Sequence, residues 1–155
     1  MGTDIHFTVE HKTADSPTWI GVYSTSVTPN FPLADIDGNN AKFDHRALYE
    51  DRNYSFFAAL ANVCGPGPAP KGVPEDASAL TRREVAAWDV DGHSHSHLSL
   101  QEFVGTWLQV CNPDLFAAHS KEMLDGAGPI TPTLSKYMGV WGEEGDFRVV
   151  FWFDN

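Results

Sequence analysis

The 155-residue sequence is poor in cysteine and in long apolar runs. Its only cysteines, Cys64 and Cys111, are too few for a disulfide framework and fit free thiols in a reducing compartment. No apolar stretch is long enough to span a bilayer, and the start of the chain has no basic segment followed by an apolar one, as a signal peptide would. We therefore expect a soluble, cytoplasmic protein with no membrane partner.

Basic residues are also scarce. Acidic residues outnumber them 21 to 10, which gives a formal net charge of −11 at pH 7. Binding to duplex DNA or RNA needs a basic surface that neutralises phosphates, so this balance argues against a nucleic-acid partner. A small anionic ligand needs only a few well-placed cations, and it stays compatible with the sequence.

The common motifs of nucleotide and calcium sites are missing. The sequence has no Walker loop, Rossmann glycine fingerprint or nucleophile elbow. The stretches DIDGNN and DVDG resemble parts of an EF-hand loop. Aligned on Gly38, however, the first ligand position is Leu33, and aligned on Gly92 the last is Leu98. Calcium binding by an EF-hand is therefore excluded.

What is present predicts a single α+β domain over residues 1–155. Apolar and polar side chains alternate over 4–12 as in a half-buried strand, and 19–27 predicts a hairpin partner. Residues 137–155 are rich in β-formers and predict two further strands, joined around 143–145. Helices are predicted over 46–63 with a break near Asn53, over 78–88, from Ser99 to about Val110, and over 114–126. We expect an antiparallel sheet built from the N- and C-terminal strands, with the helices packed on one face.

Residues 64–74, CGPGPAPKGVP, cannot form regular structure, because proline lacks an amide donor and glycine loses entropy when ordered. A long segment of this kind inside a compact domain is often a lid or a binding loop. It contains Lys71, which together with Arg52 could supply positive charge to a phosphate. The alternatives are a tolerated loop lysine and a surface salt bridge.

Asp4 and His6 lie two positions apart on the first predicted strand, so both point to the same side of the sheet. A carboxylate beside an imidazole can orient the ring and favour its protonated form, which suits an acid–base pair. The alternative is a pair of polar residues on the solvent face of an edge strand.

Three histidines occupy alternate positions just before a predicted helix: His93, His95 and His97. In extended backbone all three project to one side, and His-x-His is a familiar metal chelate. Asp91 is a further candidate ligand, but no fourth ligand is fixed by spacing. We expect no cofactor, with a divalent metal ion at this cluster as the alternative. A polar loop with one functional histidine is a further alternative.

The histidine segment also leads into the N-terminus of a helix, where backbone amides and the helix dipole favour an anion. Ser94 and Ser96 would add hydroxyl groups around a phosphate there. The elements HFTV and HLSL resemble the paired motifs of 2H-type phosphoesterases, in which one histidine acts as base and the other as acid without a metal.

Four blocks of the sequence, MGTDIH, RNYSFFAALANV, PKGVPEDAS and DGHSHSHLSLQE, together resemble a family of small phage and prophage proteins. Members typically open with Met-Gly-Cys-Asp-Ile-His and carry Arg-Asn-Tyr, Pro-Arg-Gly-Leu-Pro-Asp and His-Ser-x-Ser segments. Here Thr3 stands in place of the Cys, and Lys71 in place of an Arg. The resemblance favours His6 and His93 as a functional pair over His95 and His97, which fall at variable positions of the family.

The resemblance implies a phage counter-defence protein that acts in the host cytoplasm on a cyclic di- or oligonucleotide immune signal. We expect a phosphodiesterase in which His6 and His93 share the acid and base roles and Asp4 orients His6. The ligand would be held by five further residues: Ser94, Ser96, Arg52, Tyr54 and Lys71. The alternatives are a sponge that sequesters the nucleotide without chemistry, as a homo-oligomer, and an acidic inhibitor that binds a host protein.

Overall fold

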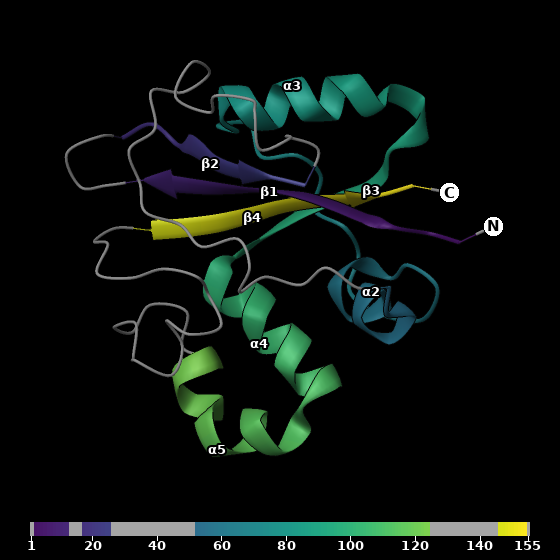
Figure 1. Ribbon diagram of the computed structural model, residues 1–155, viewed down its shortest axis with the longest axis vertical. Helices are drawn as coiled ribbons and strands as arrows, with labels where there is room; N and C mark the ends of the chain where they lie inside the picture. Colours follow the sequence, from purple (N-terminus) through teal and green to yellow (C-terminus); the bar gives the residue numbers. More distant parts are fainter. Residues whose placement is uncertain (1, 13–16, 26–51, 125–145, 155) are drawn as a thin grey trace.

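A four-stranded antiparallel sheet forms the centre of the part of the chain that the computed structural model describes, residues 2–12, 17–25, 52–124 and 146–154 (Figure 1). The strand order is β2-β1-β4-β3. The strands span Ile5–Lys12 (β1), Ile20–Ser24 (β2), His93–Ser99 (β3) and Asp146–Phe153 (β4). The first and last strands are therefore the two central ones, and they pair from Ile5 opposite Phe153 to Lys12 opposite Asp146.

The helices of the described residues are α2 (Tyr54–Ala61), α3 (Ala79–Trp88), α4 (Leu100–Cys111) and α5 (Pro113–Leu124), with a short 3₁₀ turn η2 (Asp89–Asp91). Three of them begin at a polar cap whose side chain accepts a hydrogen bond from a first-turn amide. The caps are Asn53 for α2, Ser78 for α3 and Ser99 for α4. Helix α2 thus begins directly after Asn53, where a break was predicted, and the predicted start at Ser99 is confirmed.

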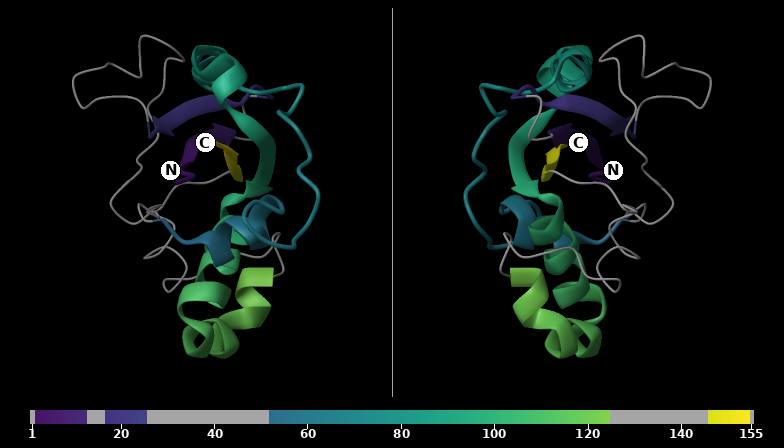
Figure 2. Two further views of the ribbon diagram at one scale, coloured as in Figure 1. Left: turned by 90° about the vertical axis from the view of Figure 1, so that its right-hand side faces the viewer. Right: turned by 90° about the vertical axis from the view of Figure 1, so that its left-hand side faces the viewer.

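The sheet is covered on both faces (Figures 1 and 2). Helices α2, α4 and α5 lie on one side and α3 lies on the other. The α+β class and the antiparallel sheet from both chain ends are confirmed, but the helices do not all share one face. The reason is that Thr8 and Glu10, the polar half of the β1 alternation, are fully buried and bonded to α3. Polar alternation in the sequence looks the same whether such a face meets water or a polar helix.

The hydrophobic core lies between the sheet and helices α2 and α4. It is dominated by phenylalanines from all these elements: Phe7, Phe56, Phe57, Phe103, Phe147, Phe151 and Phe153. The ring of Phe103 lies 5.6 Å from that of Phe7, 5.4 Å from that of Phe56 and 5.9 Å from that of Phe151, measured between centroids. Helix α4 is therefore anchored to both the sheet and α2 by one side chain.

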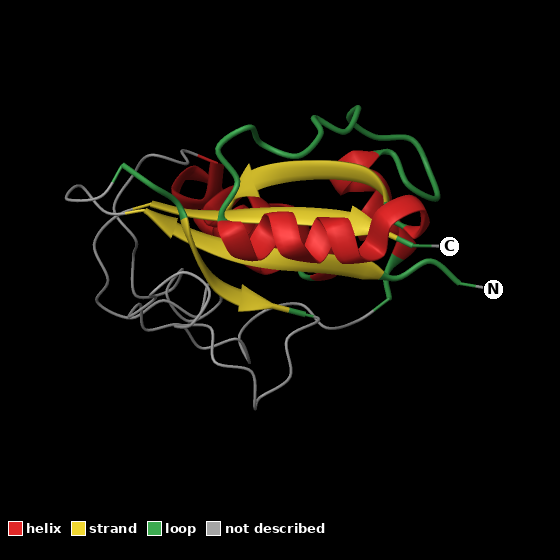
Figure 3. Cartoon of the chain, turned by 90° about the horizontal axis from the view of Figure 1, so that it is seen from above, coloured by secondary structure: helices red, strands yellow, loops and turns green. Residues whose placement is uncertain are grey.

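The segment from Asn62 to Ser78 returns across the molecule along the outer edge of β3 (Figure 3). The Gly72 amide donates to the His95 carbonyl at 2.8 Å, and the Lys71 amide donates to Ser96 Oγ at 3.1 Å. These bonds occupy part of a strand edge that would otherwise be open to another chain. The predicted Pro/Gly loop thus forms a wall along the edge of the sheet.

Other predictions fall partly or wholly outside the described residues. Strand β4 accounts for the second of the two C-terminal strands, and the first, before residue 146, lies outside them. So does the early part of the helix predicted over 46–63. Among the helices of the described residues, none has the length and apolar character to cross a membrane.

Candidate functional site

The N-terminal block MGTDIH and the block beginning at Arg52 meet at the end of the sheet where β1 starts. Arg52 Nε and Nη2 each donate to a different carboxylate oxygen of Asp4 at 2.7 Å, a bidentate pair. The hydrogen bond and the charge of Asp4 raise the pKa of Arg52 further. A Cβ atom on Gly2 would lie 2.4 Å from Arg52 Nη1 and 3.1 Å from the Tyr54 hydroxyl, so a larger residue here would have to displace the Arg52 side chain.

His6 lies beside this corner and is held by a carboxylate that the sequence did not reveal. His6 Nε2 is 3.0 Å from Oδ2 of Asp154, just after β4, and the other oxygen of Asp154 accepts the Asp4 amide at 2.8 Å. The expected Asp4–His6 pair is therefore replaced by His6–Asp154, because Asp4 is engaged by Arg52. Asp154 is 148 residues from His6 in the chain, so no local motif could have identified it.

The environment of Asp154 favours its ionised form. Partial burial raises its pKa, but the Asp4 amide, the hydrogen bond and charge of His6, and the charge of Arg52 outweigh this and lower it overall. A carboxylate at Nε2 favours the tautomer with a proton there, which leaves Nδ1 of His6 as the basic nitrogen. The Trp88 ring packs on the imidazole with centroids 3.9 Å apart. His6 is thus oriented from one side and covered from another.

His93 lies at the same end of the sheet but on its other face. His6 pairs with Trp152 of β4, whereas His93 pairs with Phe153. Successive residues of a strand point to opposite faces, so the two histidines are separated by the sheet. The His93 ring lies 6.3 Å from that of Phe153, and its Nδ1 is 3.0 Å from Ser94 Oγ. The structure thus brings Asp4, His6, Arg52 and Tyr54 together and leaves His93 and Ser94 outside that group.

The three alternate histidines do not project to one side, because the register of β3 shifts between His93 and Ser96. Ser94, within this irregularity, has a positive φ of 55°. His95 consequently stacks near Trp152, with centroids 6.1 Å apart, and His97 pairs with Val150. Within the described residues, no three histidine, cysteine or carboxylate side chains lie together to hold a metal ion. A divalent metal at this segment stays a prediction.

His95 is partly buried beside the fully buried Trp152, and each side chain has an unused polar atom. His95 Nε2 and Trp152 Nε1 are both inaccessible, and neither has a hydrogen-bond partner among the described residues. A Cβ on Gly92 would lie 3.4 Å from His95 Nε2 and 3.2 Å from the Trp152 ring, so the chain closes tightly over them. Burial, and secondarily the charge of His93, lower the pKa of His95.

This burial predicts a stability that falls as the medium is acidified. The pKa of His95 is lower in the folded protein than its ordinary value, about 6.5, so below that pH the unfolded chain takes up the proton first. The free energy of unfolding should therefore fall less steeply between about pH 7 and pH 5 in the His95→Phe variant than in the wild type. The two slopes should differ by at most about 1.4 kcal/mol per pH unit. Urea unfolding at a series of pH values measures this, and an unchanged slope would contradict it.

Two of the expected phosphate contacts, Lys71 and Ser96, lie elsewhere. Both line a cavity of about 400 Å³ between the Pro/Gly loop, α2 and α4. Ser96 pairs with Phe151 of β4, so this cavity is on the face of the sheet opposite His6. The predicted ligand-binding set is therefore divided among three places, since Arg52 and Tyr54 lie near His6, Lys71 and Ser96 line the cavity, and Ser94 lies beside His93.

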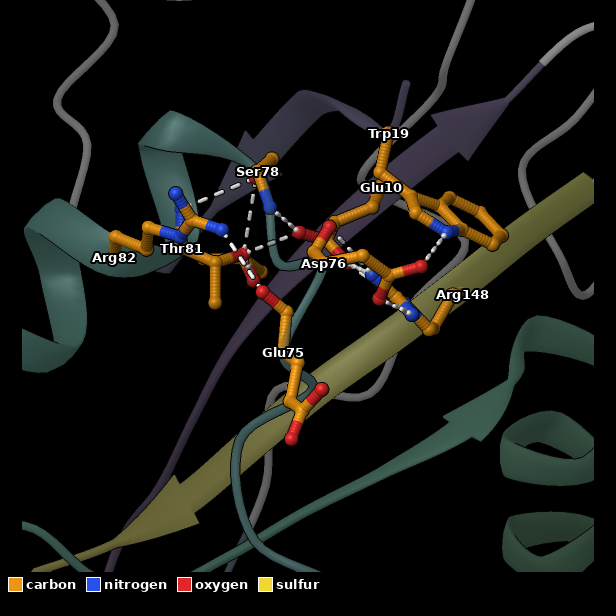
Figure 4. A network of polar contacts seen from close by, with 9 residues as sticks. Glu10, Trp19, Glu75, Asp76, Ser78, Thr81, Arg82 and Arg148 are labelled. Atoms are coloured by element: carbon orange, nitrogen blue, oxygen red, sulfur yellow. Dashed lines mark hydrogen bonds and ion pairs between the residues drawn. The ribbon is translucent and has the colours of Figure 1, made fainter. Parts of the chain in front are cut away.

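A buried polar network on the α3 face was not anticipated from the sequence (Figure 4). Glu10 is fully buried and accepts from Arg148 Nε at 2.7 Å, from the Ser78 amide and from the Thr81 hydroxyl. Arg148 also donates to Asp76 Oδ1 at 2.9 Å. The alternation of each strand could have placed Glu10 on one face of β1 and Arg148 on one face of β4. The sequence does not show the register between these strands, which brings the two side chains together. These bonds fix the start of α3 and the end of the Pro/Gly loop to the sheet.

Comparisons with known proteins add no relative: no family model, no curated protein and no solved structure matches the chain.

Proposed function

We propose that the protein is a phosphodiesterase that opens a cyclic nucleotide signal at the corner formed by Asp4, His6, Arg52, Tyr54 and Asp154. The observation that supports this most is the His6–Asp154 contact at 3.0 Å. A carboxylate that fixes an imidazole at one nitrogen leaves the other nitrogen to exchange a proton with a reactant. The phage counter-defence role suggested by the sequence is part of the same proposal.

In the proposed reaction, Nδ1 of His6 removes a proton from water as the water oxygen forms a bond to phosphorus. The bond between phosphorus and the ribose oxygen breaks, and the same imidazole returns the proton to that oxygen. One histidine can serve as base and then as acid, so no second histidine on this face is required. Arg52, bonded to Asp4 through Nε and Nη2, would direct its charge at the phosphate. Tyr54 is 43% exposed, so its ring is available to stack on the nucleobase.

The test is product analysis by mass spectrometry after incubation with a panel of cyclic di- and trinucleotides, with and without EDTA. We expect one ligand to be linearised, and His6→Gln to reduce kcat/KM by about 10²–10⁴-fold. His93→Gln is the matched control, since that imidazole lies on the other face and should leave turnover close to wild type. Loss of activity in both variants would contradict a site on one face. Recovery of every nucleotide intact from the wild type would contradict catalysis.

Sequestration without cleavage is the second candidate. Its supporting observation is that Arg52 is already neutralised by a bidentate bond to Asp4, which leaves less charge for a transition state. A sponge would bind a nucleotide tightly and release it unchanged on heat denaturation. A Kd that Tyr54→Ala weakens, with intact ligand recovered, would favour this role over hydrolysis. An acidic inhibitor of a host protein, the third hypothesis from the sequence, would instead bind no nucleotide.

A further inference from the structure

We infer that the cavity beside the Pro/Gly loop is a second binding site, for a small carboxylate with an apolar body. The cavity has a volume of about 400 Å³, within the range of small-molecule sites. Its lining is mostly apolar, with Leu60, Leu98 and Phe116 as the largest apolar side chains. This site is independent of the proposed hydrolysis, because it lies on the other face of the sheet from His6.

The cavity wall is preformed. The prolines of the loop, Pro66, Pro68 and Pro70, restrict the backbone before any ligand binds. Gly67 is packed so closely on α2 that a Cβ there would lie 1.7 Å from the Ala58 carbonyl oxygen. Further along, the amides of Lys71 and Gly72 are bonded to β3. A wall held at several points loses little freedom when a ligand enters, which favours binding.

The polar groups in the lining favour an anion. Lys71, an exposed residue of the lining, forms no ion pair with any residue that the structure describes. Ser96 is 1% exposed, and its oxygen accepts the Lys71 amide, so its own O–H remains to be donated. The acidic residue of the lining, Glu102, is exposed to solvent, and one of its carboxylate oxygens accepts a hydrogen bond from the Ser99 hydroxyl at 3.1 Å. A cation and a buried hydroxyl next to apolar side chains match a carboxylate that carries a hydrocarbon body.

The probe we choose is octanoate, compared with 1-octanol and octylammonium, in titrations of the full-length protein followed by ¹H–¹⁵N NMR. We expect octanoate to saturate a single site with shifts at residues lining the cavity. Octanol should bind more weakly and octylammonium not at all, because Lys71 repels the cation. Lys71→Met should weaken octanoate binding by about tenfold or more, and Lys71→Arg should retain most of it.

Filling the cavity separates the site from general surface binding. Ala59 lines the cavity from α2 and is half-buried, so Ala59→Phe should fill it and abolish octanoate binding. Ala86→Phe adds the same ring at an exposed position of α3 on the opposite face and should leave binding unchanged. The inference is overturned if octanoate shows no saturable binding, if its affinity survives both Lys71→Met and Ala59→Phe, or if octylammonium binds equally well. His6→Gln should not alter octanoate binding, so failure of one proposal leaves the other intact.

Discussion

Replacing Arg148 with Met is expected to lower the free energy of unfolding by about 3–5 kcal/mol, the typical cost of leaving a buried charge without its partner. Glu10 is fully buried, and the Arg148 guanidinium approaches its Oε1 at 2.7 Å through Nε and at 2.6 Å through Nη2. In the variant, the carboxylate would keep only the Ser78 amide and the Thr81 hydroxyl as partners. Urea unfolding followed by circular dichroism measures the loss.

Two further variants show whether the loss comes from the stranded charge. Glu10→Gln combined with Arg148→Met removes both charges and should recover part of the stability, giving a coupling free energy in a double-mutant cycle. Asp76→Asn removes only the exposed partner of Arg148, since the Asp76 side chain is 64% accessible. This variant should lower the free energy of unfolding by at most about 1 kcal/mol. If Arg148→Met is no more costly than Asp76→Asn, Glu10 and Arg148 do not stabilise the fold as a buried pair.

Replacing Phe103 with Ala is expected to destabilise the protein by about 3–5 kcal/mol, as for other buried phenylalanines. The side chain is fully buried, and its ring contacts Phe7 and Phe151 of the central strands and Phe56 of α2. Neighbouring rings on three elements cannot close the space together without moving those elements. The variant therefore loses the transfer free energy of the buried ring, and the cavity left in the core destabilises it further.

Phe103→Leu is the matched variant, since it keeps an apolar side chain of intermediate size and should cost less than half as much. Thermal and urea unfolding of both variants measure the difference. Trp107→Ala on the same helix removes a partly exposed aromatic residue and provides a comparison outside the centre of the core. Equal losses for Phe103→Ala and Trp107→Ala would show that α4 is not held mainly through Phe103.

Local signals in the sequence predicted most of the elements correctly. The alternation of Ile5, Phe7 and Val9 predicted β1, and the aromatic-rich end of the chain predicted β4, because one-sided burial imposes a period of two on a strand. Ser99 predicted the start of α4, because a capping side chain needs only amides within its own first turn, whereas Asn53 was predicted only as a break in a longer helix. These features depend on neighbours a few residues apart, and the sequence contains that information directly.

The candidate site was predicted only in part, because its geometry depends on register between strands. Asp4, His6, Arg52 and Tyr54 were identified and do lie together. The partner of His6, Asp154, and the separation of His6 from His93 follow from how β1 and β3 align with β4. A shift of one residue in such an alignment exchanges the faces of every side chain. The irregularity near Ser94 exchanges the faces in the same way within β3 itself, so that His95 lies on the face of Trp152.

The sequence by itself determined the α+β class, the strands at both ends and the capped helices, because each follows from local periodicity and backbone hydrogen bonding. The tertiary structure alone decided that α3 covers the second face of the sheet, that Glu10 and Arg148 meet there, and that Lys71 and Ser96 line a cavity apart from His6. The physical reason is that local pattern specifies which side chains share a face. What that face meets is decided by packing between segments that are distant in the chain.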